Sequence, residues 1–231
     1  MDLKGKKAIV TGSASGIGKG IALKLAQYGA DVVIADINDD QAKAVVFEIS
    51  EKYNVKCINI HLDVTKVSSA ENMAKETIAR LGGIDIMVNN AGGDKAMPFW
   101  ETTEEFRNWV VDFNYKGPVN CCHAILPHMM EKQAGKIVNI ASDAGRVGSS
   151  GETVYAGCKG GVIAFTKSLA RELARYRINV NCVCPGPTDT PGFVEATSEK
   201  LREALKRAIP FGRIAQPEEL GNAVFFCIKL I

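Results

Sequence analysis

A tyrosine and a lysine stand four residues apart in the stretch Tyr155-Ala156-Gly157-Cys158-Lys159. Residues at this spacing share one face of a helix, so the lysine ammonium would lie beside the tyrosine phenol. A free tyrosine has a pKa of about 10, and a neighbouring cation favours the phenolate. A decrease of roughly three pKa units would make the phenol a general acid-base near neutral pH. We therefore expect Lys159 to lower the pKa of Tyr155. Because this spacing is common on ordinary helix surfaces, the pair needs support from other motifs.

Five further features provide that support. They are Thr11-Gly12-Ser13-Ala14-Ser15-Gly16-Ile17-Gly18, Asn89-Asn90-Ala91-Gly92, Asn114, Ser142 and Pro185-Gly186. With these motifs in this order, the sequence resembles the classical short-chain dehydrogenase/reductase family. The resemblance extends from about residue 3 to about residue 226, nearly the whole chain.

The resemblance implies an enzyme that reversibly oxidises a secondary alcohol, with a hydride passing to a nicotinamide cofactor. In this family Tyr155 would take up the hydroxyl proton, and Lys159 would lower its pKa and bind the nicotinamide ribose. Ser142 would hydrogen-bond the reacting oxygen. Asn114 matches the asparagine that holds a water connecting the lysine to solvent. Together these groups would stabilise charge that develops at one oxygen.

The glycine motif lies between a short apolar run, residues 8–10, and an amphipathic stretch, residues 17–28. This pattern predicts a strand, a glycine turn and a helix. Gly12, Gly16 and Gly18 suit a turn in which the backbone approaches a pyrophosphate at a helix N-terminus, where free N-H groups favour negative charge. We expect Ser15 and Ile17 to line the same turn.

Asp36 ends the second predicted strand, residues 31–36, close to where this fold places a carboxylate on the adenosine ribose. A carboxylate there would accept both ribose hydroxyls and repel a 2′-phosphate. NADP-using members carry Arg or Lys at neighbouring positions, which here are Ser15 and Ile37. NAD is therefore the expected cofactor, although Asp36 could instead cap the next helix. The resemblance adds further cofactor contacts at Asp63, Val64, Asn90, Ala91, Gly92, Pro185, Gly186, Thr188 and Thr190.

Apolar runs and helical periodicities alternate along the chain. Predicted strands cover residues 8–10, 31–36, 55–62, 84–88, 136–142 and 178–184. Predicted helices cover residues 17–28, 39–53, 67–81, 101–130 with an interruption at 117–118, 153–176, 201–208 and 217–228. Residues 143–152 should form a loop, and residues 191–198 a mobile lid over the substrate.

These elements predict a single α/β domain over residues 1–231, a doubly wound parallel sheet of the Rossmann type. The expected strand order is 3-2-1-4-5-6. Members of the family normally continue with a seventh strand, which is missing from this chain, so we expect the C-terminus to be incomplete.

Composition limits the possible functions. The chain has 231 residues, 46% hydrophobic and 23% charged, with a net charge of +2, so no basic surface calls for nucleic acid or an anionic membrane. It has no signal-type segment and no apolar run long enough to span a bilayer, so we expect a cytoplasmic protein. The seven cysteines lack Cys-x-x-Cys spacing and the three histidines lack partners at ligand spacing, so we expect no essential metal.

The sequence says less about the substrate than about the fold and the cofactor. Residues 144–152 and 184–190 resemble alicyclic hydroxyacyl-CoA dehydrogenases, in particular 2-hydroxycyclohexanecarboxyl-CoA dehydrogenase. The alternatives are a 3-oxoacyl-ACP reductase, against which Asp36 argues, and a sugar or polyol dehydrogenase. A different class, a non-catalytic dinucleotide-binding sensor or scaffold, is disfavoured by the complete catalytic set. The candidates for contacting CoA phosphates are Lys95, Arg146 and Lys200. The family resemblance also implies a homotetramer formed through residues 101–130 and 153–176.

Overall fold

A computed structural model describes residues 2–229 and contains one six-stranded parallel sheet. The sheet order is β3-β2-β1-β4-β5-β6, which confirms the predicted order. The central strands are apolar and buried on both faces, as expected for a parallel sheet covered by two helical layers. The strands are β1 (Lys7–Thr11), β2 (Asp31–Asp36), β3 (Cys57–His61), β4 (Ile86–Asn89), β5 (Gly135–Ile140) and β6 (Ile178–Val183).

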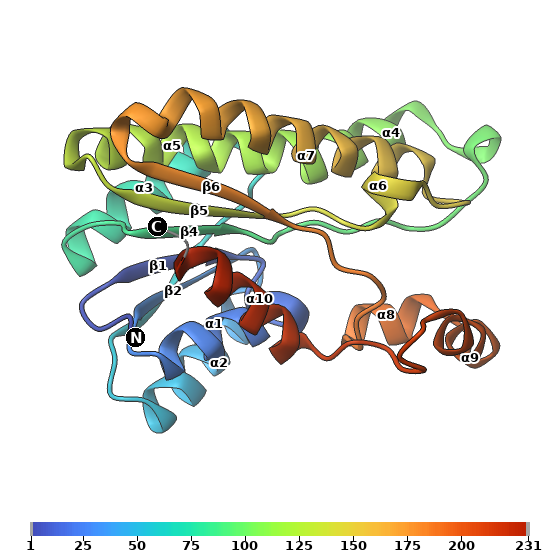
Figure 1. Cartoon of the computed structure of the whole chain (residues 1–231), viewed down its shortest axis with the longest axis horizontal. Helices are drawn as coiled ribbons and strands as arrows, with labels where there is room; N and C mark the ends of the chain where they lie inside the picture. The colour runs from blue at the N-terminus through green and yellow to red at the C-terminus, as the bar shows by residue number, and fades with distance from the viewer. Residues whose placement is uncertain (1, 230–231) are drawn as a thin grey trace.

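Helices cover both faces of the sheet (Figure 1). One layer contains α1 (Gly16–Gln27), α2 (Asp39–Lys52) and α10 (Pro217–Lys229), which pack their apolar sides in one core. The other layer contains α3 (Val67–Leu81), α5 (Gly117–Lys132) and α7 (Thr153–Leu173), which form the second core. This arrangement confirms a Rossmann-type α/β fold.

The long segment predicted as one helix over residues 101–130 differs in detail. It consists of a 3-10 turn (Phe99–Glu101), helix α4 (Glu104–Val111), a π-helical turn (Asp112–Lys116) and α5. The predicted interruption at residues 117–118 is wrong, because α5 begins there and keeps helical backbone angles at Gly117. Proline lacks an N-H donor and is tolerated in the first turn of a helix, which is where Pro118 lies.

Two segments predicted as irregular contain short helices. Helix α6 (Ala144–Val147) lies within the expected loop of residues 143–152, and α8 (Pro191–Ala196) within the expected lid. Thr190 caps α8, since its hydroxyl accepts a hydrogen bond from the Phe193 N-H, and Pro191 follows at the first helical position. Helix α9 (Glu199–Ala208) begins two residues earlier than predicted, at a Ser198 cap. Figure 1 shows α8 and α9 projecting from the body of the protein on the side of the carboxyl ends of the strands.

The described residues contain no helix that is both long and apolar enough to cross a membrane. Within the same residues, no group of three or more His, Cys, Asp or Glu side chains could hold a metal ion. All seven cysteines are free thiols.

Candidate active site

The predicted site residues meet at the carboxyl ends of the central strands. Ser142 follows β5, and Tyr155 and Lys159 lie in the first two turns of α7. The amide N-H of Asp143 donates to the Pro185 carbonyl, at 2.9 Å, and so ties the end of β5 to the segment that follows β6. Ligands bind at this edge in open α/β sheets.

The tyrosine, lysine and serine form one contiguous group. The Lys159 ammonium lies 5.5 Å from the centroid of the Tyr155 ring. The lysine side chain is only 2% exposed, and its Nζ donates a hydrogen bond to the Ile140 carbonyl at 3.0 Å. The Ser142 hydroxyl is hydrogen-bonded to the Tyr155 side chain and accepts the Ala144 N-H at 3.2 Å. Helix α7 and the end of β5 therefore bring a phenol, an ammonium and a hydroxyl into one small site.

The pKa of Tyr155 departs from the expectation. Its pKa is raised to about 12, mainly by burial and to a smaller extent by the carboxyl groups of Glu152 and Asp94, against the lowering effect of the Ser142 hydrogen bond. Burial also lowers the pKa of Lys159 to about 8. The expected decrease in the pKa of Tyr155 is therefore wrong for the protein alone, because burial disfavours the charged phenolate.

Asn114 lies in the π-helical turn and is completely buried. Its amide Nδ2 donates to the carbonyls of Gly93, at 2.8 Å, and Val110, at 3.0 Å. Its Oδ1 accepts the Gly93 N-H at 3.0 Å. A Cβ atom added to Gly92 would lie 2.9 Å from Asn114 Oδ1 and 3.0 Å from Lys159 Nζ, so both side chains lie against Gly92. π-Turns are frequent at functional sites, and this one brings the asparagine amide to the lysine.

The glycine turn between β1 and α1 has the close packing that the motif requires. A Cβ atom on Gly18 would lie 2.1 Å from the Gly12 carbonyl oxygen, a distance that no side chain tolerates. The predicted residues Ser15 and Ile17 flank Gly16 at the start of α1, whose first N-H groups point out of the helix end. Positive charge from the helix dipole therefore accumulates beside a turn without side-chain bulk.

Asp36 is held in a fixed orientation at the end of β2. Its Oδ2 accepts the Ala14 N-H and its Oδ1 accepts the Asn38 N-H, each at 2.9 Å. Asn38, not Asp36, caps α2, because the Asn38 side chain accepts the Gln41 N-H. The helix-cap alternative for Asp36 is therefore wrong. The next residue, Ile37, is 64% exposed and brings no positive charge.

The turn after β4 is fastened to the glycine turn. The Asn90 amide donates to the carbonyls of Thr11 and Gly12, at 2.9 and 3.0 Å. The Thr11 hydroxyl accepts the N-H groups of Asn90 and Ala91, both at 3.0 Å. Thr11 was named in the sequence only as the first residue of the glycine motif, with no role of its own. These bonds keep the two turns side by side at the edge of the sheet.

The segment after β6 returns to the same glycine turn. A Cβ atom on Gly16 would lie 3.3 Å from Thr190 Cγ2, so Thr190 borders the turn. Thr188 is buried and pairs with Ala215 in an isolated bridge, and its hydroxyl donates to the Gly186 carbonyl. The predicted contacts Pro185, Gly186, Thr188 and Thr190 thus belong to one segment that faces the start of α1.

Asp63 and Val64 lie farther along the edge, after β3. The Asp63 carboxylate accepts hydrogen bonds from the N-H and the hydroxyl of Thr65. These bonds give Asp63 a structural role in the turn before α3. Val64 is buried against Gly117, and its carbonyl accepts the Asn120 amide at 3.0 Å. These two residues lie just beyond the carboxyl end of β3.

Two carboxyl groups near the phenol were missed in the sequence. A small pocket of about 10 Å³ beside the N-terminus of α7 is lined by Asp94 and Glu152 together with apolar side chains that include Phe99 and Phe106. The pKa of Asp94 is raised to about 6, mainly by burial and to a smaller extent by Glu152, against a lowering hydrogen bond from the Lys95 backbone. Glu152 lies three residues before Tyr155, and this helical spacing could have indicated that its carboxyl is near the phenol.

The residues present fit a dinucleotide. The turn at Gly12, Gly16 and Gly18 leaves free N-H groups at a helix start, and the Asp36 carboxylate stands at the next strand. The small Gly92 keeps the space before Lys159 and Asn114 clear of side-chain atoms. The glycine turn thus suits a phosphate, the Asp36 carboxylate suits a ribose, and the space beside Gly92 suits a nicotinamide.

Comparisons with known proteins agree with this geometry. The family model for short chain dehydrogenase matches residues 6–201. The (2S)-[(R)-hydroxy(phenyl)methyl]succinyl-CoA dehydrogenase subunit BbsD of Thauera aromatica is 38% identical, over 98% of this chain and 90% of that protein. The 3-oxoacyl-[acyl-carrier-protein] reductase FabG of Chlamydia muridarum is 37% identical, over 97% and 90%, and that of Thermotoga maritima 38%, over 98% and 91%. The chain belongs to the short chain dehydrogenase family and is an oxidoreductase.

Proposed function

We propose that the protein is an NAD-dependent dehydrogenase for the secondary alcohol of a hydroxyacyl thioester, such as an alicyclic 2-hydroxyacyl-CoA. The observation that carries the proposal is the contiguous group of Ser142, Tyr155 and Lys159, with Asn114 against the same glycine. A site of this kind can move one proton at an alcohol oxygen while stabilising charge on that oxygen.

The proposed cofactor site runs from the glycine turn to Lys159. The backbone N-H groups at the start of α1 would bind the pyrophosphate, and the Asp36 carboxylate would accept the adenosine ribose hydroxyls. NAD is favoured because a 2′-phosphate would meet the fixed carboxylate of Asp36 without a cation at Ser15 or Ile37. When bound, the nicotinamide ring accepts the hydride and, in its oxidised form, carries one positive charge.

Tyr155 would act as the general base in alcohol oxidation. Its Oη would take the hydroxyl proton, while the Ser142 hydroxyl would hydrogen-bond the same oxygen and orient the alcohol. A phenol whose pKa is about 12 is mostly protonated near neutral pH, so the reaction needs added positive charge at the site. Lys159 would supply part of it, because its ammonium is buried beside the ring. Asn114 would hold the backbone of Gly93 and keep the lysine side chain in place.

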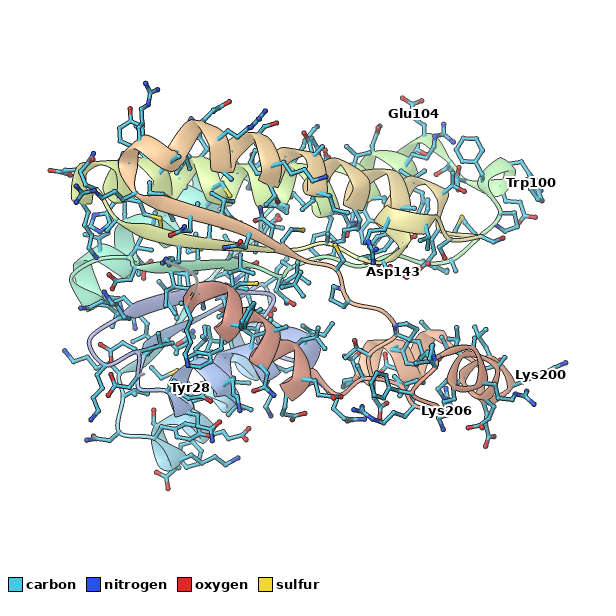
Figure 2. The ribbon with its side chains drawn as sticks, viewed as in Figure 1. Tyr28, Trp100, Glu104, Asp143, Lys200 and Lys206 are labelled. Atoms are coloured by element: carbon cyan, nitrogen blue, oxygen red, sulfur yellow. The ribbon has the colours of Figure 1, made fainter. Side chains whose placement is uncertain are left out.

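The thioester assignment rests on family resemblance together with one relative that is named as a CoA-ester dehydrogenase. Of the three cations considered for the CoA phosphates, Arg146 is paired with Asp143 at 3.2 Å and remains largely exposed. Figure 2 shows Asp143 facing the space toward α8, whereas Lys200 lies at the far end of α9 and points outward. Arg146 therefore stays the first candidate, because its segment also carries Ser142.

The alternative is a 3-oxoacyl-ACP reductase. Two of the relatives above bear that name at the same level of identity as the CoA-ester dehydrogenase, so the comparisons support both substrates equally. The two activities differ in cofactor and carrier. A higher specificity constant with NADPH and a 3-oxoacyl-ACP than with NAD and a hydroxyacyl-CoA would favour the reductase.

We also propose a homotetramer that uses α4, α5 and α7 as contact surfaces. Support comes from Trp109 of α4, which is 44% exposed and lies in a row with Phe106 and Phe113, at ring-centroid distances of 5.8 and 5.7 Å. Large aromatic side chains are enriched at protein interfaces.

The direct test is a substrate panel with the purified protein and NAD. A hydroxyacyl-CoA, the corresponding free hydroxy acid and a simple secondary alcohol would be compared by formation of reduced cofactor. The proposal expects the CoA ester to have the highest specificity constant, mainly through a lower KM, because contacts far from the reacting carbon act equally in ground and transition states. Equal specificity constants for the ester and the free acid would contradict it.

A further inference from the structure

A histidine stands beside Asp36 at the edge of the proposed adenosine site. Strands β2 and β3 are parallel neighbours, and their register places Asp36 directly opposite His61. Opposite residues of such a pair point to the same face of the sheet, and neighbouring strands lie about 4.8 Å apart. The His61 side chain therefore leaves the sheet about one strand spacing from the carboxylate that the adenosine ribose would contact.

The contacts at the start of α2 agree with this placement. The Asp36 Oδ1 accepts the N-H of Asn38, the residue that caps α2, at 2.9 Å. The His61 Nδ1 lies 3.1 Å from Oδ2 of Asp39, the first residue of α2. Two carboxylates and one imidazole therefore meet where β2, β3 and α2 come together.

The His61 ring keeps its second nitrogen available to a ligand. The side chain is 55% exposed, and within residues 2–229 the ring is hydrogen-bonded through Nδ1 alone. Ile37, between Asp36 and the helix cap, adds no charge. A cation that faced a phosphate beside Asp36 would therefore come from His61.

The surroundings of His61 are mainly acidic. The charged side chains near it on β2, on α2 and in the turn after β3 are Asp36, Asp39, Asp40, Lys43 and Asp63. Lys43 is paired with Asp40 at 3.6 Å, and on the other face of β3 Arg80 is paired with Glu76 at 3.4 Å. Histidine is the side chain whose charge normally changes between about pH 5 and 8, whereas carboxylates and lysines normally keep theirs. The sign of the charge beside Asp39 therefore depends on the protonation of His61.

We propose that His61, paired with Asp39, determines how strongly the protein rejects NADP and makes that rejection depend on pH. This inference rests on the proposed function and concerns the adenosine end of the same site. While His61 is neutral, a 2′-phosphate would be repelled by the carboxylates of Asp36 and Asp39. Once protonated, His61 offsets the charge of Asp39 and offers an N-H to the phosphate, so tolerance of NADP rises as the pH falls.

The first experiment measures binding at the adenosine end, without turnover. The probes are adenosine 5′-monophosphate and adenosine 2′,5′-bisphosphate, which differ only in the 2′-phosphate. Their calorimetric dissociation constants would be compared at about pH 8 and about pH 5.5 for wild type and His61→Gln. Glutamine can donate to Asp39 but carries no charge. We expect the preference for the monophosphate to fall about threefold more in wild type than in His61→Gln as the pH is lowered. Equal falls would overturn the proposal.

His123→Gln is the matched control. His123 is an exposed histidine on α5, in the other helical layer. The 2′-phosphate itself gains a proton near about pH 6, and this contribution is common to all the proteins compared. The control should therefore follow wild type at both pH values. A control that behaved like His61→Gln would show a general effect of histidine charge and contradict the assignment to His61.

A second variant tests the sign of the effect. His61→Lys is positively charged at both pH values. At about pH 8 it should bind the bisphosphate, relative to the monophosphate, about threefold more tightly than wild type does. The affinity for the monophosphate checks that each variant is folded. A lysine variant with the wild-type preference would contradict the proposal.

Turnover separates this inference from the proposed function. The specificity constants for NAD and NADP would be measured at both pH values, for wild type and His61→Gln, with the same secondary alcohol. A wild type that preferred NADP throughout would refute the proposed NAD dependence, and the nucleotide binding would still decide the role of His61. A preference for NAD that changed with pH equally in both proteins would refute the role of His61 and leave the NAD dependence standing.

Discussion

Replacing Lys159 by methionine should make the protein more stable while abolishing its activity. The Lys159 side chain is 2% exposed, and burial lowers its pKa from 10.5 to about 8. A base whose pKa is lower in the folded state is destabilising while it is charged, because the charge is better solvated in the unfolded chain. Methionine has a similar length and no charge, so the variant removes the desolvation of the ammonium and leaves the site filled.

The size of the effect follows from the pKa difference. The difference between 10.5 and about 8 corresponds to about 3 kcal/mol of destabilisation near neutral pH. Loss of the hydrogen bond from Nζ to the Ile140 carbonyl offsets about 1 kcal/mol of this gain. We therefore expect the free energy of unfolding of Lys159→Met to exceed that of wild type by about 2 kcal/mol near neutral pH.

The pH dependence of this stability difference shows whether the charge on Lys159 causes it. Between the folded pKa of about 8 and the unfolded pKa of 10.5 the unfolded chain binds more protons, so wild-type stability relative to the variant rises with pH. The gain in stability should be full below pH 8 and should disappear as the pH rises toward 10.5, where the lost hydrogen bond leaves the variant about 1 kcal/mol less stable than wild type. Urea unfolding across this range would measure it, with the exposed Lys167→Met of the same helix as the control. A Lys159→Met variant that was less stable at every pH would refute the reasoning.

Three further predictions concern the cofactor turn, cofactor choice and assembly. Gly18→Ala should bind NAD poorly and unfold at lower urea concentration, because its Cβ would lie 2.1 Å from the Gly12 carbonyl oxygen; wild-type affinity in calorimetry would contradict this. Asp36→Ala combined with Ile37→Arg should shift the ratio of specificity constants toward NADP by about tenfold or more, since repulsion is removed and a phosphate partner is added. A wild type that already prefers NADP would refute the Asp36 argument. Trp109→Glu should weaken the proposed tetramer in light scattering, whereas a monomeric wild type would disprove that assembly.

Much of the fold follows from sequence pattern. Apolar runs such as the one that ends at Thr11 predict strands buried on both faces, and residues 67–81 form a helix over the predicted range. The order of strands follows from the resemblance to a doubly wound family. The π-helical turn at Asp112–Lys116 could not be predicted, because its residues have no periodicity that separates it from an ordinary helix.

The candidate site was predictable in its residues and less so in its electrostatics. The spacing of Tyr155 and Lys159 correctly predicts that the ammonium lies near the ring. The sequence does not indicate how deeply the phenol is buried, and burial reverses the direction expected for its pKa. Asp94 and Glu152 come from segments far apart in the chain, so their meeting in one pocket emerges only from the folded structure.

The central claim is that Tyr155 transfers the proton in a nicotinamide-dependent oxidation. It is tested most directly by comparing wild type and Tyr155→Phe in one assay, formation of reduced NAD from a hydroxyacyl-CoA, with NAD affinity measured separately by calorimetry. Phenylalanine keeps the ring and removes the transferable proton, so we predict nearly complete loss of turnover with NAD binding largely retained. Substantial residual turnover in a variant that binds NAD normally would contradict the account.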